Sequence, residues 1–174
     1  MKYVAYLFFI LLNRLFIPYR LTNLEKNFRQ LKNFFLEKNM AFVGKNANIR
    51  PYVKLSYLEN ISIGMNSSIG DKSSIVAADK VIIGNDVLMG PEVMIFTQNH
   101  DITNTNIKLI DGGTIKKSVL IEDNVWIGAR TIILPGAHIK SGTVIAAGSV
   151  VPGKEFPCNV VIGGNPARVI KERR

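Results

Sequence analysis

Histidine is the side chain whose charge changes most readily near neutral pH, and this 174-residue sequence has two, His100 and His138. His100 lies in the polar stretch Asn99-His100-Asp101, where a positioned imidazole could accept a proton from a substrate hydroxyl. Asp101 could orient the ring. The single cysteine, Cys158, has no partner for an intrachain disulfide or at metal-ligand spacing, so no metal site is predicted and a reducing compartment is expected.

A six-residue repeat runs through residues 41–174 and must position these side chains. Aliphatic residues recur every six positions at Ile121, Ile127, Ile133, Ile139, Ile145 and Val151. The first five are each followed, four positions later, by a small or β-branched residue: Val125, Thr131, Ala137, Thr143 and Ser149. The pattern also occurs at Ile63 and Ile69, at Ile83 and Met89, and more weakly at Val43 and Ile49. Neither the helical nor the strand period produces this asymmetric pairing.

Short strands that turn at regular corners explain the period, so the predicted fold is an all-β solenoid whose stacked coils share one core. Glycine follows the aliphatic residue in Ile63-Gly64, Ile69-Gly70 and Ile127-Gly128, where we expect corners with unusual dihedral angles. The repeat is interrupted at about residues 97–118, a polar segment predicted to protrude as a loop that carries His100. His138, just before an inward position, is predicted to face outward.

Residues 1–40 do not follow the repeat and form a predicted helical segment. An apolar run, Tyr3 to Leu12, is too short to span a membrane, and no signal-peptide cleavage site follows it. It is therefore predicted to lie at a membrane interface or to pack on the body. The interface is favoured because several basic side chains could face anionic headgroups: Arg14, Arg20, Lys26, Arg29 and Lys32.

A second, amphipathic helix is predicted from apolar residues spaced by three and four, with a capping box at Thr22 and Glu25. Its apolar face, predicted to cover one end of the body, consists of Leu21, Leu24, Phe28, Leu31 and Phe35. Residues 1–40 carry +5 of the total charge of +9 (seven Lys and Arg against two Glu). No basic stripe interleaved with aromatics accompanies this charge, which argues against nucleic-acid binding.

Ordered motifs in the repeat region carry a family resemblance: Asn124-Val125-Trp126-Ile127-Gly128, Leu134-Pro135-Gly136, Ala146-Ala147-Gly148-Ser149-Val150-Val151 and Gly164-Asn165-Pro166-Ala167-Arg168. Residues 41–174 resemble the left-handed β-helix, or hexapeptide-repeat, acyltransferases of the galactoside and maltose acetyltransferase branch. The resemblance implies a left-handed coil, acetyl-CoA as acetyl donor, and a homotrimer with active sites between subunits. It also implies a catalytic histidine in the loop, at the position of His100.

Further site residues are implied by position. Ala129 and Ala147 match residues whose backbone lines the pantetheine arm, and the Ala129 N–H is a candidate oxyanion donor. Three basic residues match positions near the nucleotide phosphates, with solubility on a basic surface as the less favoured alternative: Lys154, Arg168 and Lys171. The acceptor pocket would include Trp126, Asn99 and Asp71, with a packing role on the coil exterior as the alternative for Trp126.

The acceptor positions depart from the galactoside and maltose pattern, because Asp71 and Lys72 stand where that branch has asparagine and Ala78 stands at an acidic position. The Asn99-His100-Asp101 form and the apolar, basic N-terminus resemble instead the O-acetyltransferases of capsule, exopolysaccharide or O-antigen synthesis, whose glycan acceptors are lipid-linked or polymeric. The predicted function is therefore transfer of acetyl from acetyl-CoA to a sugar hydroxyl of a bacterial surface polysaccharide or its precursor. The predicted location is the cytoplasm, extending to peripheral association with the inner face of the membrane.

Three alternatives stay open. One is N-acetylation of a nucleotide-linked amino sugar, and another is acetylation of free maltose or galactoside. The third is a solenoid scaffold without catalysis.

Overall fold

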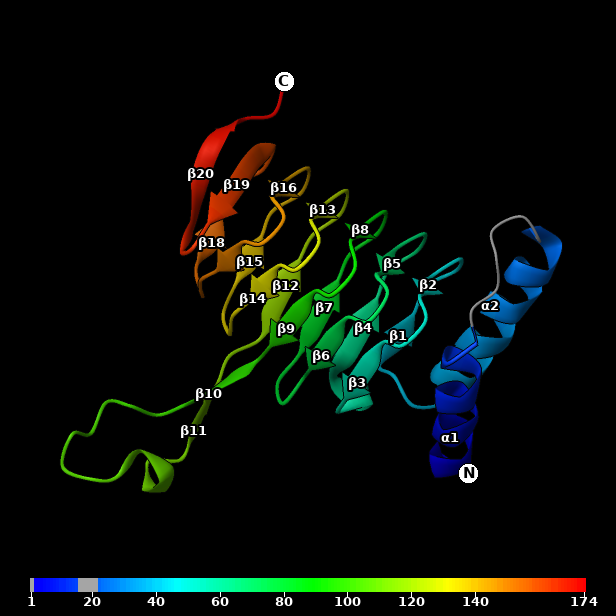
Figure 1. The fold of residues 1–174 in the computed structure, drawn as a ribbon, viewed down its shortest axis with the longest axis horizontal. Coiled ribbons are helices and arrows are strands. Elements are labelled where there is room, and N and C mark those ends of the chain that lie inside the picture. Colours follow the sequence, from blue (N-terminus) through cyan, green and yellow to red (C-terminus); the bar gives the residue numbers. More distant parts are fainter. Residues whose placement is uncertain (1, 16–21) are drawn as a thin grey trace.

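The computed structural model describes residues 2–15 and 22–174, which form two helices followed by a parallel β-solenoid (Figure 1). The described residues make six turns, of which the first five have three short strands each and the last has two. The first three turns are β1 (Phe42–Val43), β2 (Asn48–Ile49) and β3 (Lys54–Ser56); β4 (Ile61–Ile63), β5 (Ser68–Ile69) and β6 (Ser74–Val76); and β7 (Val81–Ile83), β8 (Leu88–Met89) and β9 (Met94–Phe96).

The last three turns follow the protruding loop. They are β12 (Val119–Ile121), β13 (Trp126–Ile127) and β14 (Ile132–Ile133); β15 (His138–Ile139), β16 (Val144–Ile145) and β17 (Val150–Val151); and β18 (Glu155–Phe156) with β19 (Val160–Gly164). The chain then reverses into β20 (Ala167–Glu172), which pairs antiparallel with β19. Short 3₁₀ helices lie at Leu58–Asn60 and Leu109–Asp111.

The strands stack into three faces. The first face runs β1-β4-β7-β12-β15-β18, and the third runs β3-β6-β9-β14-β17. The second face holds β2 and β5, then β8, β13, β16 and β19. Equivalent residues of successive turns pair in register, for example Ile121 with Ile139 on the first face and Ile127 with Ile145 on the second. The six-residue period predicted from the sequence is therefore the period of the coil.

The residues at the repeating aliphatic positions, which we call the ladder residues, fill the interior of the solenoid. Every predicted aliphatic position is buried except Val43, which is half-buried at the open first turn. The small positions are buried as well, and their hydroxyls bond to backbone: Ser67 Oγ donates to the Gly84 carbonyl at 2.6 Å, and Thr131 Oγ1 donates to the Gly128 carbonyl at 2.8 Å. Polar side chains thus satisfy corner backbone groups inside an otherwise apolar core.

The glycines that follow the ladder residues are required for a reason other than the one predicted. They do not have positive φ; instead, a Cβ on Gly64 would lie 2.4 Å from the carbonyl carbon of Gly84 in the next turn. The left-handed corner conformation falls two residues later and is often held by non-glycine residues such as Asn66, Lys72 and Arg130. Close stacking between turns, and not an unusual dihedral angle, selects glycine at these positions.

The interruption of the repeat forms the predicted protrusion, which leaves the solenoid between β9 and β12 (Figure 1). Its base is an antiparallel pair, β10 (Gln98–His100) with β11 (Thr114–Lys116), in which His100 lies opposite Thr114. Thr97 is buried and its carbonyl accepts a hydrogen bond from the Lys117 N–H, so the protrusion begins after Thr97. A two-stranded stem therefore carries His100 away from the coil.

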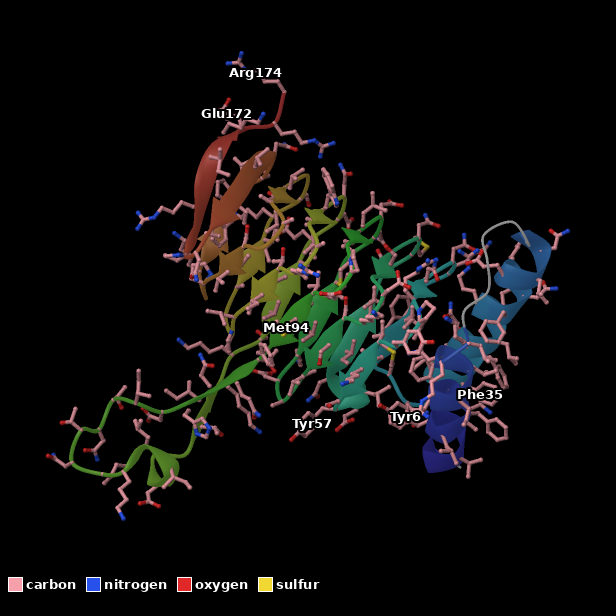
Figure 2. All side chains as sticks on the ribbon, in the orientation of Figure 1. Tyr6, Phe35, Tyr57, Met94, Glu172 and Arg174 are labelled. Carbon is pink, nitrogen blue, oxygen red and sulfur yellow. The ribbon has the colours of Figure 1, made fainter. Side chains whose placement is uncertain are left out.

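Helix α1 (Lys2–Asn13) packs on the open end of the first turn (Figure 2). Ala5 and Phe9 are buried, and the Tyr6 hydroxyl donates to the Leu55 carbonyl at 2.7 Å. The Asn13 amide donates to the Val53 carbonyl at 3.0 Å. Of the two predicted placements, packing on the body is therefore observed for one face of α1. No helix among the described residues is long and apolar enough to cross a membrane.

Helix α2 (Thr22–Leu36) presents to the body a face that only partly overlaps the predicted one, because Phe28 and Phe35 are half-buried. The buried residues are Lys32, Asn33 and Leu36, whereas Leu24 and Leu31 are exposed. Lys32 Nζ donates to the Ile49 carbonyl at 2.5 Å and the Asn33 amide donates to the Ala47 carbonyl at 2.8 Å. The first turn has no preceding turn to bond its carbonyls, so the capping helix needs donors there more than it needs leucine. The predicted Leu21 lies outside the described residues.

Candidate active site

An open, mostly apolar groove of roughly 970 Å³ follows the corner between the second and third faces. Three of the predicted site residues line it: Trp126, Ala129 and Ala147. Its other lining residues include Gly90, Pro91, Val144 and Val161, which the sequence analysis did not single out. Trp126 is 55% exposed on β13, so its indole forms part of the wall and is not part of the core.

The repeat register explains which residues line this groove. Pro91, Ala129 and Ala147 each stand two positions after a ladder residue of the second face, at equivalent places in successive turns. We call these three residues, with Asp71 and Pro51 from the earlier turns, the corner column. Backbone hydrogen bonds tie the column together: the N–H of the residue after each member donates to the carbonyl of the member one turn earlier, as Glu92 does to Asp71 and Arg130 to Pro91. The same register would have identified Pro91 from the sequence.

Small side chains keep this corner narrow and accessible. A Cβ on Gly128 would lie 2.4 Å from the Ala147 N, so the turns stack closely behind the groove. Within the described residues, the Ala129 N–H has no hydrogen-bond acceptor, while the Ala129 carbonyl accepts from Gly148 at 2.8 Å. A backbone N–H is therefore available as a hydrogen-bond donor where small residues line the groove. A groove of this kind suits a slender ligand with amide groups, such as a pantetheine arm.

The predicted phosphate-binding residues are divided. Lys171 on β20 pairs with the groove residue Val161, and Arg168 pairs with Gly163, which stacks against Ala146. Both side chains are exposed at the C-terminal end of the groove. Lys154 precedes β18 on the first face, with its ammonium 5.1 Å from the Phe156 ring centroid, and does not line the groove.

Towards the other end of the corner column lies Asp71, one turn after Pro51. Its carboxylate is 3.5 Å from Nε of Arg50 in an ion pair. Arg50 and Pro51 border a small cavity under α2 that Arg29 and Lys32 also line. Burial lowers the pKa of the Lys32 ammonium to about 8. The corner column therefore extends from the helices, past Asp71, to the basic C-terminal hairpin.

His100 stands apart from this groove within one chain. It is exposed at the end of β10, and its imidazole has no hydrogen-bond partner in the described part of the chain. Figure 1 shows the hairpin projecting from the side of the solenoid opposite β8, β13 and β16. Asn99 is exposed on the same strand. Within one chain, His100, the predicted base, therefore lies away from the groove that is predicted to bind the acetyl donor.

The carboxylate of Asp101 bonds within its own loop. Its Oδ1 accepts the Thr103 N–H at 2.9 Å and the Thr103 hydroxyl at 2.7 Å. The backbone and then the side-chain hydrogen bond of Thr103 lower the pKa of the Asp101 carboxyl. This is the geometry of an Asx turn behind His100, and the predicted orienting role of Asp101 stays a prediction.

His138 lies on the outer surface of the first face, between two carboxylates. Its Nε2 is 2.7 Å from Glu122 Oε1, and its Nδ1 is 3.2 Å from Glu155 Oε2. Nowhere in residues 2–15 and 22–174 do three His, Cys, Asp or Glu side chains group as metal ligands.

Comparison with known proteins defines the family. Residues 118–153 match the model described as "Bacterial transferase hexapeptide (six repeats)". Over 151 residues the chain is 38% identical to the galactoside O-acetyltransferase of Escherichia coli K12, covering 87% of this chain and 70% of the relative. It is 33% identical over 141 residues to a protein named as a colanic acid biosynthesis acetyltransferase, WcaF, of the same strain, covering 80% and 74%.

Solved structures agree. A maltose O-acetyltransferase from Clostridium difficile 630 superposes with a TM-score of 0.81 at 31% identity, covering 99% of this chain and 86% of that one. A galactoside acetyltransferase in complex with coenzyme A superposes with a TM-score of 0.80, also at 31% identity, covering 99% and 81%.

The chain belongs to the hexapeptide-repeat acyltransferases, and the predicted left-handed β-helix is confirmed. Within that family it is an acetyl-CoA-dependent acetyltransferase, as predicted.

Proposed function

We propose that this acetyltransferase moves the acetyl group of acetyl-CoA to a sugar hydroxyl of a bacterial surface polysaccharide or its precursor, with His100 as general base. The observation that carries the proposal is the exposed imidazole of His100, held on a two-stranded stem and free of hydrogen-bond partners among the described residues. An imidazole that must bind a substrate hydroxyl needs to be accessible and unengaged.

Each step has a residue in this chain. His100 takes the hydroxyl proton as the sugar oxygen attacks the thioester carbonyl, and the imidazolium then protonates the departing thiolate of coenzyme A. The N–H of Ala129, which lacks an acceptor within the described residues, would stabilise the oxyanion of the tetrahedral intermediate. Trp126, Ala129 and Ala147 would line the pantetheine arm and the acceptor, with Arg168 and Lys171 near the phosphates.

The active site would form between subunits of a homotrimer. The His100 hairpin and the groove lie on different sides of one chain, so a neighbouring copy has to bring them together (Figure 1). Large apolar side chains are exposed on the protruding loop, as expected for a surface that packs against a partner: Ile102, Leu109 and Ile110. Asn99 on the hairpin and Asp71 on the corner column would then approach the acceptor from two subunits.

Histidine substitutions test the general base. We expect His100→Ala to lower kcat for acetyl transfer by about 10²–10⁴-fold, the usual contribution of a general base. His138→Ala is the matched control, because His138 bonds only to surface carboxylates and should leave the rate unchanged. Equal rates for wild type and His100→Ala would refute the assignment.

Two other kinds of acceptor stay as alternatives. The match to a galactoside O-acetyltransferase favours a free galactoside. A tetrahydropyridine dicarboxylate N-acetyltransferase of Clostridium perfringens, 50% identical over 56 residues or 23% of its length, acetylates nitrogen and so supports transfer to an amine, such as that of an amino sugar. Acetyl-CoA turnover against free sugars, nucleotide-linked amino sugars and capsular oligosaccharides separates these candidates. An ester product is released by mild base, whereas an amide is not.

A further inference from the structure

The outer face of the two N-terminal helices is apolar and lacks a partner in the described part of the chain. On α1, residues spaced along one helical side are about half exposed: Val4, Leu7, Phe8, Leu11 and, just beyond the helix, Leu15. On α2, Leu24, Leu31 and Phe34 are exposed in the same way. Together these eight residues form what we call the outer helix face.

Aromatic contacts join the exposed apolar residues of α1 and those of α2 into one surface. The Phe8 ring stacks on Phe35 with centroids 5.3 Å apart, and Phe35 meets Phe34 edge to face at 5.5 Å. Figure 2 shows Phe35 where the two helices meet. The opposite sides of both helices are already used, since Phe9, Lys32 and Leu36 are buried against the first turn. Apart from the Phe8 ring, the outer helix face therefore takes no part in the described contacts that cap the solenoid.

Basic side chains border this apolar surface. The Lys38 ammonium lies 4.4 Å from the centroid of the exposed Phe34 ring, and Arg14 stands beside Leu15 with its side chain exposed. Lys32, expected from the sequence to face lipid, is instead buried, and Arg20 lies outside the described residues. Apolar side chains flanked by exposed cations match the interfacial zone of a bilayer that carries anionic lipid.

The position of the helices favours a membrane over a soluble partner. They form one end of the solenoid, opposite the C-terminal hairpin (Figure 1). If subunits associate with their coils parallel, all helix pairs lie at the same end and bind a flat surface together. The first residues of the corner column, Pro51 and Asp71, lie next to α2, close to that surface.

We propose that the outer helix face docks this protein onto the surface of an anionic lipid bilayer. Leucine and phenylalanine side chains enter the interface while Arg14 and Lys38 contact headgroups. Docking rests on the helices alone and does not depend on the identity of the acetyl acceptor. It would, however, bring a lipid-linked sugar within reach of the corner column.

Vesicle co-sedimentation of the full chain tests this proposal. We expect binding to phosphatidylcholine vesicles that contain phosphatidylglycerol, and weaker binding without it. The double variant Leu7→Ser/Leu11→Ser should lower the partition coefficient by about tenfold or more, because two large apolar side chains are lost from the interface. Arg14→Gln/Lys38→Gln should weaken binding only to the anionic vesicles.

The matched control is Ile170→Ser, which removes an equally exposed apolar side chain (61%) on β20 at the far end of the molecule. It should bind vesicles like the wild type, and thermal unfolding checks that every variant folds. Unchanged binding of Leu7→Ser/Leu11→Ser, or no binding of the wild type, would overturn the proposal. So would a smaller oligomer for that variant in sedimentation equilibrium, because the face would then be a subunit contact.

Discussion

At the scale of single residues, the environment of His100 differs from that of the other histidine. Both nitrogens of His138 face carboxylates, whereas the His100 ring is unpartnered in the described chain and its neighbour Asp101 bonds to Thr103. A base that is oriented only in the assembled, substrate-bound site is a common arrangement, since catalytic hydrogen bonds often tighten on binding. Two roles of Asp101 can then be tested separately: stabilising the turn through Thr103 and orienting the imidazole ring of His100.

Asp101→Asn separates these roles. The amide oxygen can still accept from Thr103, so the turn should persist while the charge is lost. We expect the acid limb of the pH profile of kcat/KM to be unchanged and activity to stay close to wild type. Asp101→Ala, which has no acceptor, should be less active. A displaced acid limb in Asp101→Asn would assign the orienting role to Asp101.

Lys32 has a titration behaviour that the capping geometry explains. Burial lowers the folded-state pKa of Lys32 to about 8, below its ordinary value of 10.5. Between these two values the unfolded chain holds a proton that the folded chain has lost, so the folding stability rises with pH there. The wild type should therefore gain about 2 kcal/mol relative to Lys32→Met between about pH 7 and about pH 9.5.

Urea unfolding at a series of pH values measures this difference. Lys45→Met is the control, because Lys45 is exposed near the same end of the coil and should show no such divergence. Parallel stability curves for the wild type and Lys32→Met would contradict a buried ammonium at the Ile49 carbonyl.

At the scale of elements, turn stacking decides which glycines can be replaced. A Cβ on Gly70 would lie 1.8 Å from the Gly90 carbonyl oxygen in the next turn, whereas Gly148 has open space but a φ of +71°. Gly70→Ala must push two turns of backbone apart, so we expect a loss of about 3 kcal/mol or more. Gly148→Ala carries only the left-handed penalty of about 1 kcal/mol.

Thermal and urea unfolding of the two alanine variants give the comparison. Gly70→Ala should lower the midpoint several times more than Gly148→Ala. Similar losses would mean that corner conformation, and not turn-to-turn contact, is what these glycines provide.

The coil could be predicted from the sequence because buried aliphatic residues, such as Ile127, Ile133 and Ile139, recur every six positions. The left-handed corners could not, because residues as different as Asn66, Lys72 and Arg130 adopt them once the stacked turns hold the backbone. The prediction for the face of α2 is correct for the half-buried Phe28 and Phe35 and wrong for two leucines. The spacing of apolar residues predicted that Leu24 and Leu31 face the body. The carbonyl groups of the open first turn need hydrogen-bond donors, however, and Lys32 and Asn33 provide them.

The residues of the candidate active site could also be predicted only in part. Ala129, Ala147 and Trp126 were identified by resemblance and do share one groove, while Pro91 and Val161 were missed although they stand in equivalent registers. Lys154 falls on another face. Within one chain the His100 hairpin and the groove lie on different sides of the solenoid, and the repeat pattern of one chain does not encode how two chains would bring them together.

At the scale of the whole molecule, the proposed active site between subunits predicts complementation between two inactive variants. His100→Ala keeps an intact groove. Ala147→Trp keeps His100 but fills the groove, and because Ala147 is exposed the fold should tolerate it. Each variant alone should be nearly inactive.

Co-unfolding and refolding equal amounts of the two variants should restore about a quarter of the wild-type activity, since random association pairs an intact hairpin with an intact groove at about one site in four. The restored activity should need subunit exchange, so the two folded variants mixed without refolding are the control. Native mass spectrometry of differently tagged chains verifies that hybrids form. If hybrids form and no activity returns, hairpin and groove belong to the same chain, and the hairpin would have to fold back onto its own solenoid to reach the acetyl donor.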